Sequence, residues 1–202
     1  MNKRILIEIT SGGYVSGRQV EHPSHRHIGI DICAGLDFII GTRLTGFCLG
    51  PPFPSGVGEW KEDMIHQSFP RYTDFDPRAP VWCVTPNRSG CIHRFFDTSP
   101  VSPSGRYLAV FQLPFEDRQP APGEAGNIVV VDLETGEDRA VAETCGWESQ
   151  MGANINWGGS DRELFFNDVD TANWEPFAWK LDPLNGKRQR MEGTVYHASA
   201  DG

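Results

Sequence analysis

Short apolar runs separated by turn residues characterise the second half of the chain. Runs at 106–112 (RYLAVFQ), 127–133 (NIVVVDL) and 138–143 (DRAVAE) are rich in Val, Ile, Ala and aromatic side chains. Val, Ile and aromatic residues favour strands. Turn-forming sequences stand before the first run (SPSG) and between the second and third (ETG). Because no helical period persists, the pattern predicts an antiparallel β-meander.

The same order of elements then recurs. The turn sequence GGSD at 158–161 precedes an apolar run at 162–167 (RELFFN), and a run at 176–181 (PFAWKL) leads into DPLNGK at 182–187. A third unit begins at 195–199 (VYHAS) and is followed by ADG. The aligned units are ~42 to 55 residues apart, a period typical of the four-stranded blades of β-propellers.

The segments SPSGRYLAV…NIVVVDLETGE and WGGSDRELFFND…LDPLNGK resemble the repeats of TolB-type propellers. In those repeats S-P-D-G precedes a strand and D-x-x-T-G follows one. The segments are also similar to the propeller of the oligogalacturonate lyase family. The resemblance covers residues 95–202 and implies a propeller fold. An ordinary β-sandwich and two unrelated meanders are the alternatives that the residues themselves leave open.

The first part of the chain lacks this regularity. Strand-like runs occur at 3–10 (KRILIEIT), 37–42 (DFIIGT) and 81–85 (VWCVT). Between them, Pro and Gly interrupt the sequence so often at 47–58 (FCLGPPFPSGVG) that this stretch is expected to be a loop.

We therefore expect an all-β chain in which a loop-rich N-terminal region, 1–94, precedes an incomplete TolB-like β-propeller, 95–202. The second region holds about two four-stranded blades plus the first strand of a third. Since a closed ring needs about four blades or more, this count indicates either a fragment of a longer propeller protein or a chain whose partner blades come from elsewhere, and we favour the fragment. The open blade edges predict self-association. The side chains expected to be buried are Leu108, Val110, Val129, Val131, Leu164 and Phe166.

Composition and charge limit the kinds of partner that this chain is expected to bind. The chain has 18 basic and 27 acidic residues, a formal net charge of −9. Such a surface repels phosphate backbones and anionic headgroups, so we expect neither nucleic acid nor a membrane as a partner. No apolar run is long enough to span a bilayer, and Glu8 interrupts the short run after Lys3 and Arg4. The expected location is the cytoplasm, or the periplasm if the N-terminus is truncated or misassigned.

The five cysteines form no CxxC pair, which favours reduced thiols over a disulfide framework or a zinc site. Cys83 and Cys91 flank the turn-like sequence PNRSG. If they face each other across a hairpin, they are the one pair placed for a disulfide.

Candidate ligand-binding residues precede or lie on the first strand of each expected blade. That strand lines the central channel of a propeller, where ligands commonly bind. Each position carries a polar or titratable side chain that could orient a polar substrate, act as a base or satisfy buried backbone groups. The candidates are Arg94, Asp97, Gln150, Asn154 and His197.

A second candidate is a histidine cluster near the N-terminus. His22, His25 and His27 fall within six residues, and imidazole is a common zinc ligand. The competing interpretation is an exposed polar loop. If the chain binds a divalent metal, this cluster is one place for it; no other cofactor is indicated.

The sequence favours a binding or scaffold module of the propeller type that recognises a carbohydrate or another small polar ligand. The alternative follows from the resemblance: part of a metal-dependent lyase that cleaves uronates by β-elimination. In that family His and Gln side chains hold the metal and an Arg assists. His197 and Gln150 are of the right type but match no ligand motif, so no catalytic residue is assigned and enzymatic activity stays open.

Overall fold

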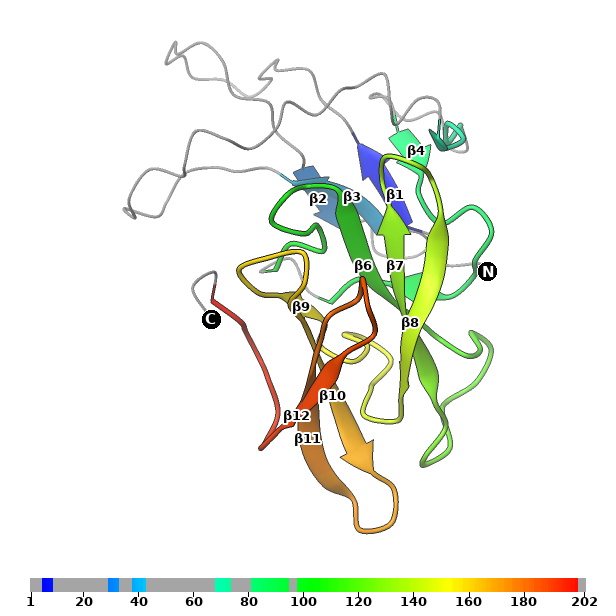
Figure 1. The fold of residues 1–202 in the computed structure, drawn as a ribbon. Coiled ribbons are helices and arrows are strands. Elements are labelled where there is room, and N and C mark those ends of the chain that lie inside the picture. Colours follow the sequence, from blue (N-terminus) through cyan, green and yellow to red (C-terminus); the bar gives the residue numbers. More distant parts are fainter. Residues whose placement is uncertain are drawn as a thin grey trace, which may run out of the picture.

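The computed structural model describes residues 5–8, 29–32, 38–42, 68–73, 81–94 and 98–199. Within these residues the strands form three four-stranded sheets (Figure 1). Two of the sheets are antiparallel throughout and follow chain order, as expected for the repeated units. The all-β prediction is therefore confirmed, whereas none of the sheets closes on itself.

The first of these two sheets, here the first repeat sheet, holds the three runs predicted around residues 106–143. Its strands are β5 (Cys91–Ile92), β6 (Tyr107–Gln112), β7 (Gly126–Asp132) and β8 (Asp138–Thr144). The short strand β5 was not expected. It lies before residue 95 and pairs antiparallel with β6.

The second repeat sheet has the same order. Its strands are β9 (Asn156–Trp157), β10 (Leu164–Asp170), β11 (Glu175–Leu181) and β12 (Arg188–Met191). The runs predicted at 162–167 and 176–181 are confirmed as β10 and β11. The outermost strand, β12, was missed because its sequence RQRM is too polar to read as a strand.

The N-terminal strands form a mixed sheet in the order β2-β3-β1-β4. The three strands predicted there are present and a fourth, β2, was not foreseen. Their bounds are β1 Ile5–Glu8, β2 Gly29–Ile32, β3 Phe38–Thr42 and β4 Val81–Cys83. Strands β1 and β3 are parallel, and β4 pairs antiparallel with β1.

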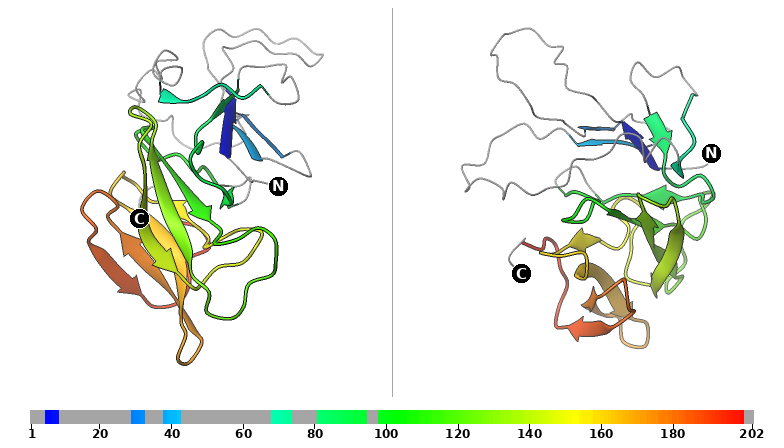
Figure 2. Two further views of the ribbon diagram at one scale, coloured as in Figure 1. Left: turned by 90° about the vertical axis from the view of Figure 1, so that its right-hand side faces the viewer. Right: turned by 45° about the horizontal axis from the view of Figure 1, so that its top comes forward.

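Both faces of the first repeat sheet are buried. Leu108, Val110, Val129 and Val131 pack against Trp82 and other side chains from the β4 segment. On the opposite face, Ala109, Phe111, Ile128 and Val130 pack against Leu164 and Phe166 of the second repeat sheet. The three sheets are consequently layered, with the first repeat sheet in the middle (Figure 2). All six side chains predicted to be buried are buried.

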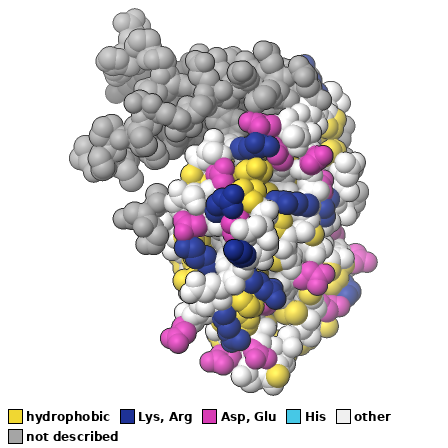
Figure 3. Space-filling view, in the orientation of Figure 1, with side chains coloured by type: hydrophobic (Ala, Val, Ile, Leu, Met, Phe, Trp, Pro, Cys, Tyr) yellow, Lys and Arg dark blue, Asp and Glu magenta, His cyan; other side chains and the backbone are white. Residues whose placement is uncertain are grey.

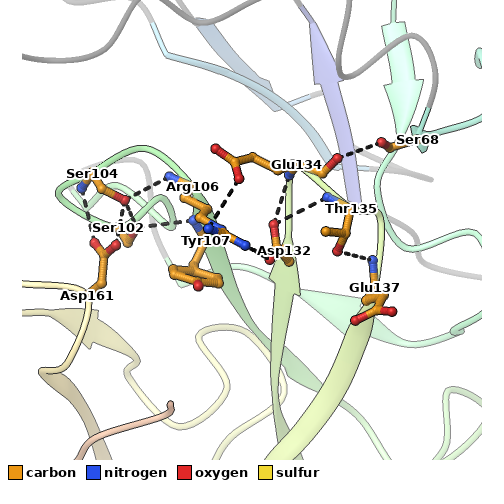
Figure 4. Close-up of polar contacts among 10 residues, drawn as sticks. All are labelled: Ser68, Ser102, Ser104, Arg106, Tyr107, Asp132, Glu134, Thr135, Glu137 and Asp161. Carbon is orange, nitrogen blue, oxygen red and sulfur yellow. Dashed lines mark hydrogen bonds and ion pairs between the residues drawn. The ribbon is translucent and has the colours of Figure 1, made fainter.

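The DLETG and DPLNG turns have the same hydrogen bonds. In the first, the Asp132 carboxylate accepts the N–H groups of Glu134 (2.9 Å) and Thr135 (3.3 Å) (Figure 4). The Gly136 N–H donates to the Asp132 carbonyl (2.8 Å). In the second, Asp182 accepts the Leu184 N–H (2.9 Å), and the Gly186 N–H returns to the Asp182 carbonyl (2.9 Å). Both glycines have a φ of 77°, which glycine adopts without strain.

An arginine ties each of these turns to the start of the strand next to it. Arg106 donates to the Asp132 carboxylate (2.8 Å), and Arg162 donates to Asp182 (2.9 Å). The serine turn before Arg106 is joined to the second repeat sheet through Ser104, whose hydroxyl and N–H both donate to Asp161 (Figure 4). The sequence alignment of the two units is thus matched by equivalent contacts in space.

Two expectations are corrected. Cys83 and Cys91 do not face each other across a hairpin, because β4 belongs to the N-terminal sheet and β5 to the first repeat sheet, and neither cysteine forms a disulfide. Burial raises the pKa of the Cys91 thiol to about 12. Residues 195–199 form no strand, because side chains rather than a neighbouring strand bind the backbone there.

No helix in the described ranges has the length and apolar character needed to cross a bilayer.

Replacing Asp132 by Ala should lower the free energy of unfolding by about 2 kcal/mol, because two turn N–H groups and a guanidinium lose their acceptor. Asp182→Ala should behave alike. Urea unfolding measures the effect, and Glu137→Ala, which removes an exposed side chain next to the same turn, should stay within about 0.5 kcal/mol of wild type. Equal losses in all three variants would contradict the role given to the aspartates.

The contribution of Asp132 should also depend on pH. Burial acts to raise the pKa of Asp132, but hydrogen bonds from Arg106 and from backbone N–H groups outweigh it and lower the pKa. A carboxylate whose pKa is lowered in the folded state stabilises the folded protein at pH values above the ordinary Asp pKa of about 3.9. This stabilisation is lost as the pH falls through the lowered pKa of the folded state. The stability difference between wild type and Asp132→Asn should therefore shrink in acid, as urea unfolding across a pH series would measure.

Candidate functional site

Four polar side chains converge where the two repeat sheets meet. Arg94 follows β5, Asn154 precedes β9, Asn156 lies on β9 and Asn167 lies on β10. Together these four residues are called the Arg94 cluster. All four side chains donate hydrogen bonds to the backbone carbonyls of two successive residues. Asn154 and Asn167 donate to the Val195 carbonyl. Arg94 and Asn156 donate to the Tyr196 carbonyl.

Arg94 and Asn156 form the buried part of this cluster. Arg94 is 4% exposed and Asn156 is 1% exposed. Nη1 of Arg94 donates to Oδ1 of Asn156 (2.8 Å) and also to the Tyr196 carbonyl. The Tyr196 ring lies over the guanidinium at 4.4 Å, within cation–π range, although the ring itself is 64% exposed. The tyrosine therefore covers the charge of Arg94 from solvent.

The side chain of Asn167 forms a pair of hydrogen bonds with the Val195 backbone, as the backbone of a neighbouring strand would. Its Nδ2 donates to the Val195 carbonyl (3.1 Å), and its Oδ1 accepts the Val195 N–H (2.8 Å). Asn154 adds a longer bond to the same carbonyl (3.3 Å) from a backbone with a φ of 59°, a left-handed conformation that Asn tolerates. The Oδ1 of Asn154 is buried and accepts no hydrogen bond from the described residues.

A cavity of about 330 Å³ lies beside this cluster, and Asn154 and Asn167 form part of its wall. Trp147, Met151, Val169 and Pro176 contribute apolar surface, while Glu148, Asp168 and Thr194 contribute polar groups. A volume near the lower end of the range for small-molecule sites, with a mixed apolar and polar wall, suits a small ligand that has both apolar and polar groups.

Hydrogen bonds and a ring contact position the side chains of Asp168 and Trp147 in the cavity wall. The Asp168 carboxylate accepts hydrogen bonds from the Thr144 hydroxyl (2.8 Å) and the Trp179 indole (2.9 Å), and so links the two repeat sheets. The indole of Trp147 donates to the Glu124 carbonyl (2.6 Å), and its ring lies 5.2 Å from that of Phe111. Both side chains are thus positioned before any ligand enters.

The cavity wall carries negative charge. Glu148 and Asp168 are its charged residues, and no Lys, Arg or His among the described residues lines it. Cys145 is also in the wall; burial and the nearby carboxylates of Asp168 and Glu143 raise the pKa of its thiol. The thiol donates to the Gly123 carbonyl (3.2 Å), and both this bond and the raised pKa favour the protonated thiol over the thiolate.

The candidates from the sequence have different outcomes. Arg94 and Asn154 are brought into one cluster by the fold, whereas Gln150 and His197 are exposed and join neither the cluster nor the cavity wall. The remaining candidates, Asp97, His22, His25 and His27, lie outside the described residues.

Two members of the cluster, Asn156 and Asn167, were missed. Each is an asparagine within a strand, where Asn is rare, and that rarity was the signal available in the sequence. The segments 81–94 and 98–199, with the other described residues, contain no group of three or more His, Cys, Asp or Glu side chains that could hold a metal ion.

Comparison with known proteins finds no matching family model, no matching curated protein and no matching solved structure.

Asn167→Ala should release the segment that contains Val195, because both of its hydrogen bonds to that backbone are lost. Amide hydrogen exchange at Val195 should accelerate by about tenfold. Asn173→Ala, on the exposed hairpin between β10 and β11, is the matched control and should leave this exchange unchanged. Unaltered protection of the Val195 amide in Asn167→Ala would show that the side chain does not hold the segment.

Proposed function

We propose that this chain is a binding module of the β-propeller type that recognises a small polar ligand, with a carbohydrate as the best-fitting class. The repeated sheets support the propeller interpretation: they share strand order, turn hydrogen bonds and Arg–Asp ion pairs, and they stack face to face. Neighbouring blades of a propeller stack in this way because a single blade cannot cover both of its faces.

The cavity beside the Arg94 cluster is the observation that carries the proposal. Sugars are recognised by aromatic surface together with hydrogen-bonding groups in fixed positions. Trp147 supplies the aromatic surface. The carboxylate of Glu148 and the Oδ1 of Asn154, which accepts no hydrogen bond from the described residues, supply polar contacts. Their positions in the wall come from packing between the two sheets.

Charge further narrows the ligand class. A uronate carboxylate would approach two carboxylates, Glu148 and Asp168, without a cation in the described wall to offset them. Neutral sugars and amino sugars meet no such repulsion. Their hydroxyl and ammonium groups donate hydrogen bonds that carboxylate and amide oxygens accept. The proposed ligand is therefore a neutral or amino sugar.

The lyase alternative requires a positive charge beside the substrate carboxylate. Arg94, in the cluster beside the cavity, is one candidate, but Tyr196 covers its guanidinium and the Tyr196 carbonyl accepts one of its N–H groups. A uronate could reach Arg94 only if this segment moved away. The module proposal needs no such movement.

Ligand-observed NMR with glucose, glucosamine and galacturonate tests the proposal. Glucose and glucosamine should bind saturably, and galacturonate should bind at least about fivefold more weakly because of the two carboxylates. Asn154→Gly, which keeps a residue suited to positive φ but removes the amide, should weaken sugar binding by about fivefold.

Trp174→Ala provides the control, since Trp174 is an exposed aromatic outside the cavity wall. It should leave sugar affinity unchanged. Absence of saturable binding for the neutral and amino sugars, or equal losses in Asn154→Gly and Trp174→Ala, would exclude the cavity as the carbohydrate site.

Titration with a divalent ion such as Ca²⁺ or Mn²⁺ addresses the lyase alternative separately. If that alternative holds, saturable binding should be lost in His197→Ala and kept in His25→Ala, as isothermal calorimetry would show. Loss only in His25→Ala would instead locate a metal site in the N-terminal histidine cluster. Under the module proposal we expect no saturable metal binding at His197.

A further inference from the structure

The outer edge of β12 is unpartnered in the described part of the chain. Strand β12 is the outermost of the second repeat sheet and pairs only with β11 on its inner side. Its register fixes which backbone groups face outward. The Asp182 N–H donates to the Lys187 carbonyl (2.8 Å), so Gln189 and Met191 also pair inward. The N–H and C=O groups of Arg188 and Arg190 therefore face the free edge.

The side chains of these two arginines are held in fixed positions. The guanidinium of Arg188 lies 4.3 Å from the Trp179 ring centroid, and that of Arg190 lies 3.7 Å from the Phe177 ring centroid. Arg188 stands opposite Leu181 and Arg190 opposite Trp179, so the aromatic partner of each arginine is its diagonal neighbour on β11 and both side chains project from one face. Successive same-face residues of a strand are ~7 Å apart, which is also the spacing of alternate side chains in an extended partner strand.

The edge is cationic although the whole chain is acidic. Lys187 directly precedes β12, and Arg139 reaches from β8 to donate to the Pro183 carbonyl (2.7 Å) beside it. Lys187, Arg188, Arg190 and Arg139 are all exposed, and Glu192 is the one acid among residues 187–192. The face of the molecule seen in Figure 3 carries Lys and Arg side chains interspersed with Asp and Glu. A local positive patch on a chain of net charge −9 selects an anionic partner.

Charge also decides against self-pairing at this edge. Two β12 strands pairing edge to edge would bring Arg188 and Arg190 of both copies together, and like charges across a strand pair are destabilising. Cationic edge strands commonly prevent aggregation in this way. The same charges attract a strand of opposite sign.

We propose that the β12 edge binds an extended acidic peptide of another protein by strand addition. The backbone of the peptide pairs with the outward N–H and C=O groups of Arg188 and Arg190. Carboxylates at alternate positions of the peptide then meet the two stacked guanidinium groups, and such pairs are bidentate when well aligned. This surface is separate from the sugar cavity, and neither proposal depends on the other.

A short fluorescein-labelled peptide of alternating Glu and Val tests this with the full chain. Fluorescence anisotropy should show saturable binding that weakens as salt increases. The same peptide with Lys in place of Glu should not bind, and N-methylation of alternate residues, which blocks the backbone N–H groups facing β12, should reduce affinity by at least about tenfold. Amide exchange should slow at Arg188 and Arg190 on binding, while the inward Gln189 amide should change little.

Substitutions on β12 test whether the peptide contacts this edge. The double variant Arg188→Gln with Arg190→Gln should lose about tenfold in peptide affinity, whereas Arg118→Gln, an exposed arginine on another loop, should not. Unimpaired binding of the N-methylated peptide to the wild-type chain would overturn strand addition even if the double variant failed to fold. Tighter binding to phosphatidylserine vesicles or to single-stranded DNA than to the acidic peptide would overturn the choice of partner.

Discussion

The burial of both faces of the first repeat sheet is the constraint on which the rest of the structure depends. One face packs against the β4 segment and the other against the second repeat sheet, so β6 and β7 are apolar almost throughout rather than in alternation. Each fully buried aliphatic or aromatic side chain in these layers contributes about 1.5–3 kcal/mol. Phe69, Trp82 and Val84, which precede residue 95, are therefore part of the core that covers this sheet.

Stacking of the two repeat sheets also creates the polar features between them. Asp168 joins the sheets through Thr144 and Trp179, and a cavity is left beside these contacts. Among the described residues no strand pairs with the backbone of Val195 and Tyr196, and the Arg94 cluster satisfies its carbonyls instead. Buried backbone groups need partners, and here amide and guanidinium side chains provide them.

Charge is distributed unevenly over this scaffold. The cavity wall is acidic and the β12 edge is cationic, so the two proposed partners have different chemistry: a neutral or amino sugar in the cavity, and an acidic strand at the edge. The lowered pKa values of Asp132 and Asp182 belong to a third setting, the structural turns, where the carboxylates accept backbone N–H groups and pair with arginines. The most regular motifs of the sequence thus have structural roles, and the candidate binding residues lie elsewhere.

The sequence by itself determined the strands with strong apolar runs and the turns between them. SPSG, DLETG and DPLNG specify local hydrogen bonds within a few residues, so β6, β7, β10 and β11 and the alignment of the two units could be read directly. The short or polar strands β5, β9 and β12 depend on pairing with a neighbour, and only the tertiary structure established them. The same holds for the candidate site. Arg94 and Asn154 could be nominated from their positions before or within expected strands. That they meet Asn156 and Asn167 around the backbone of Val195 and Tyr196 follows from contacts between residues far apart in the chain, which no local pattern encodes.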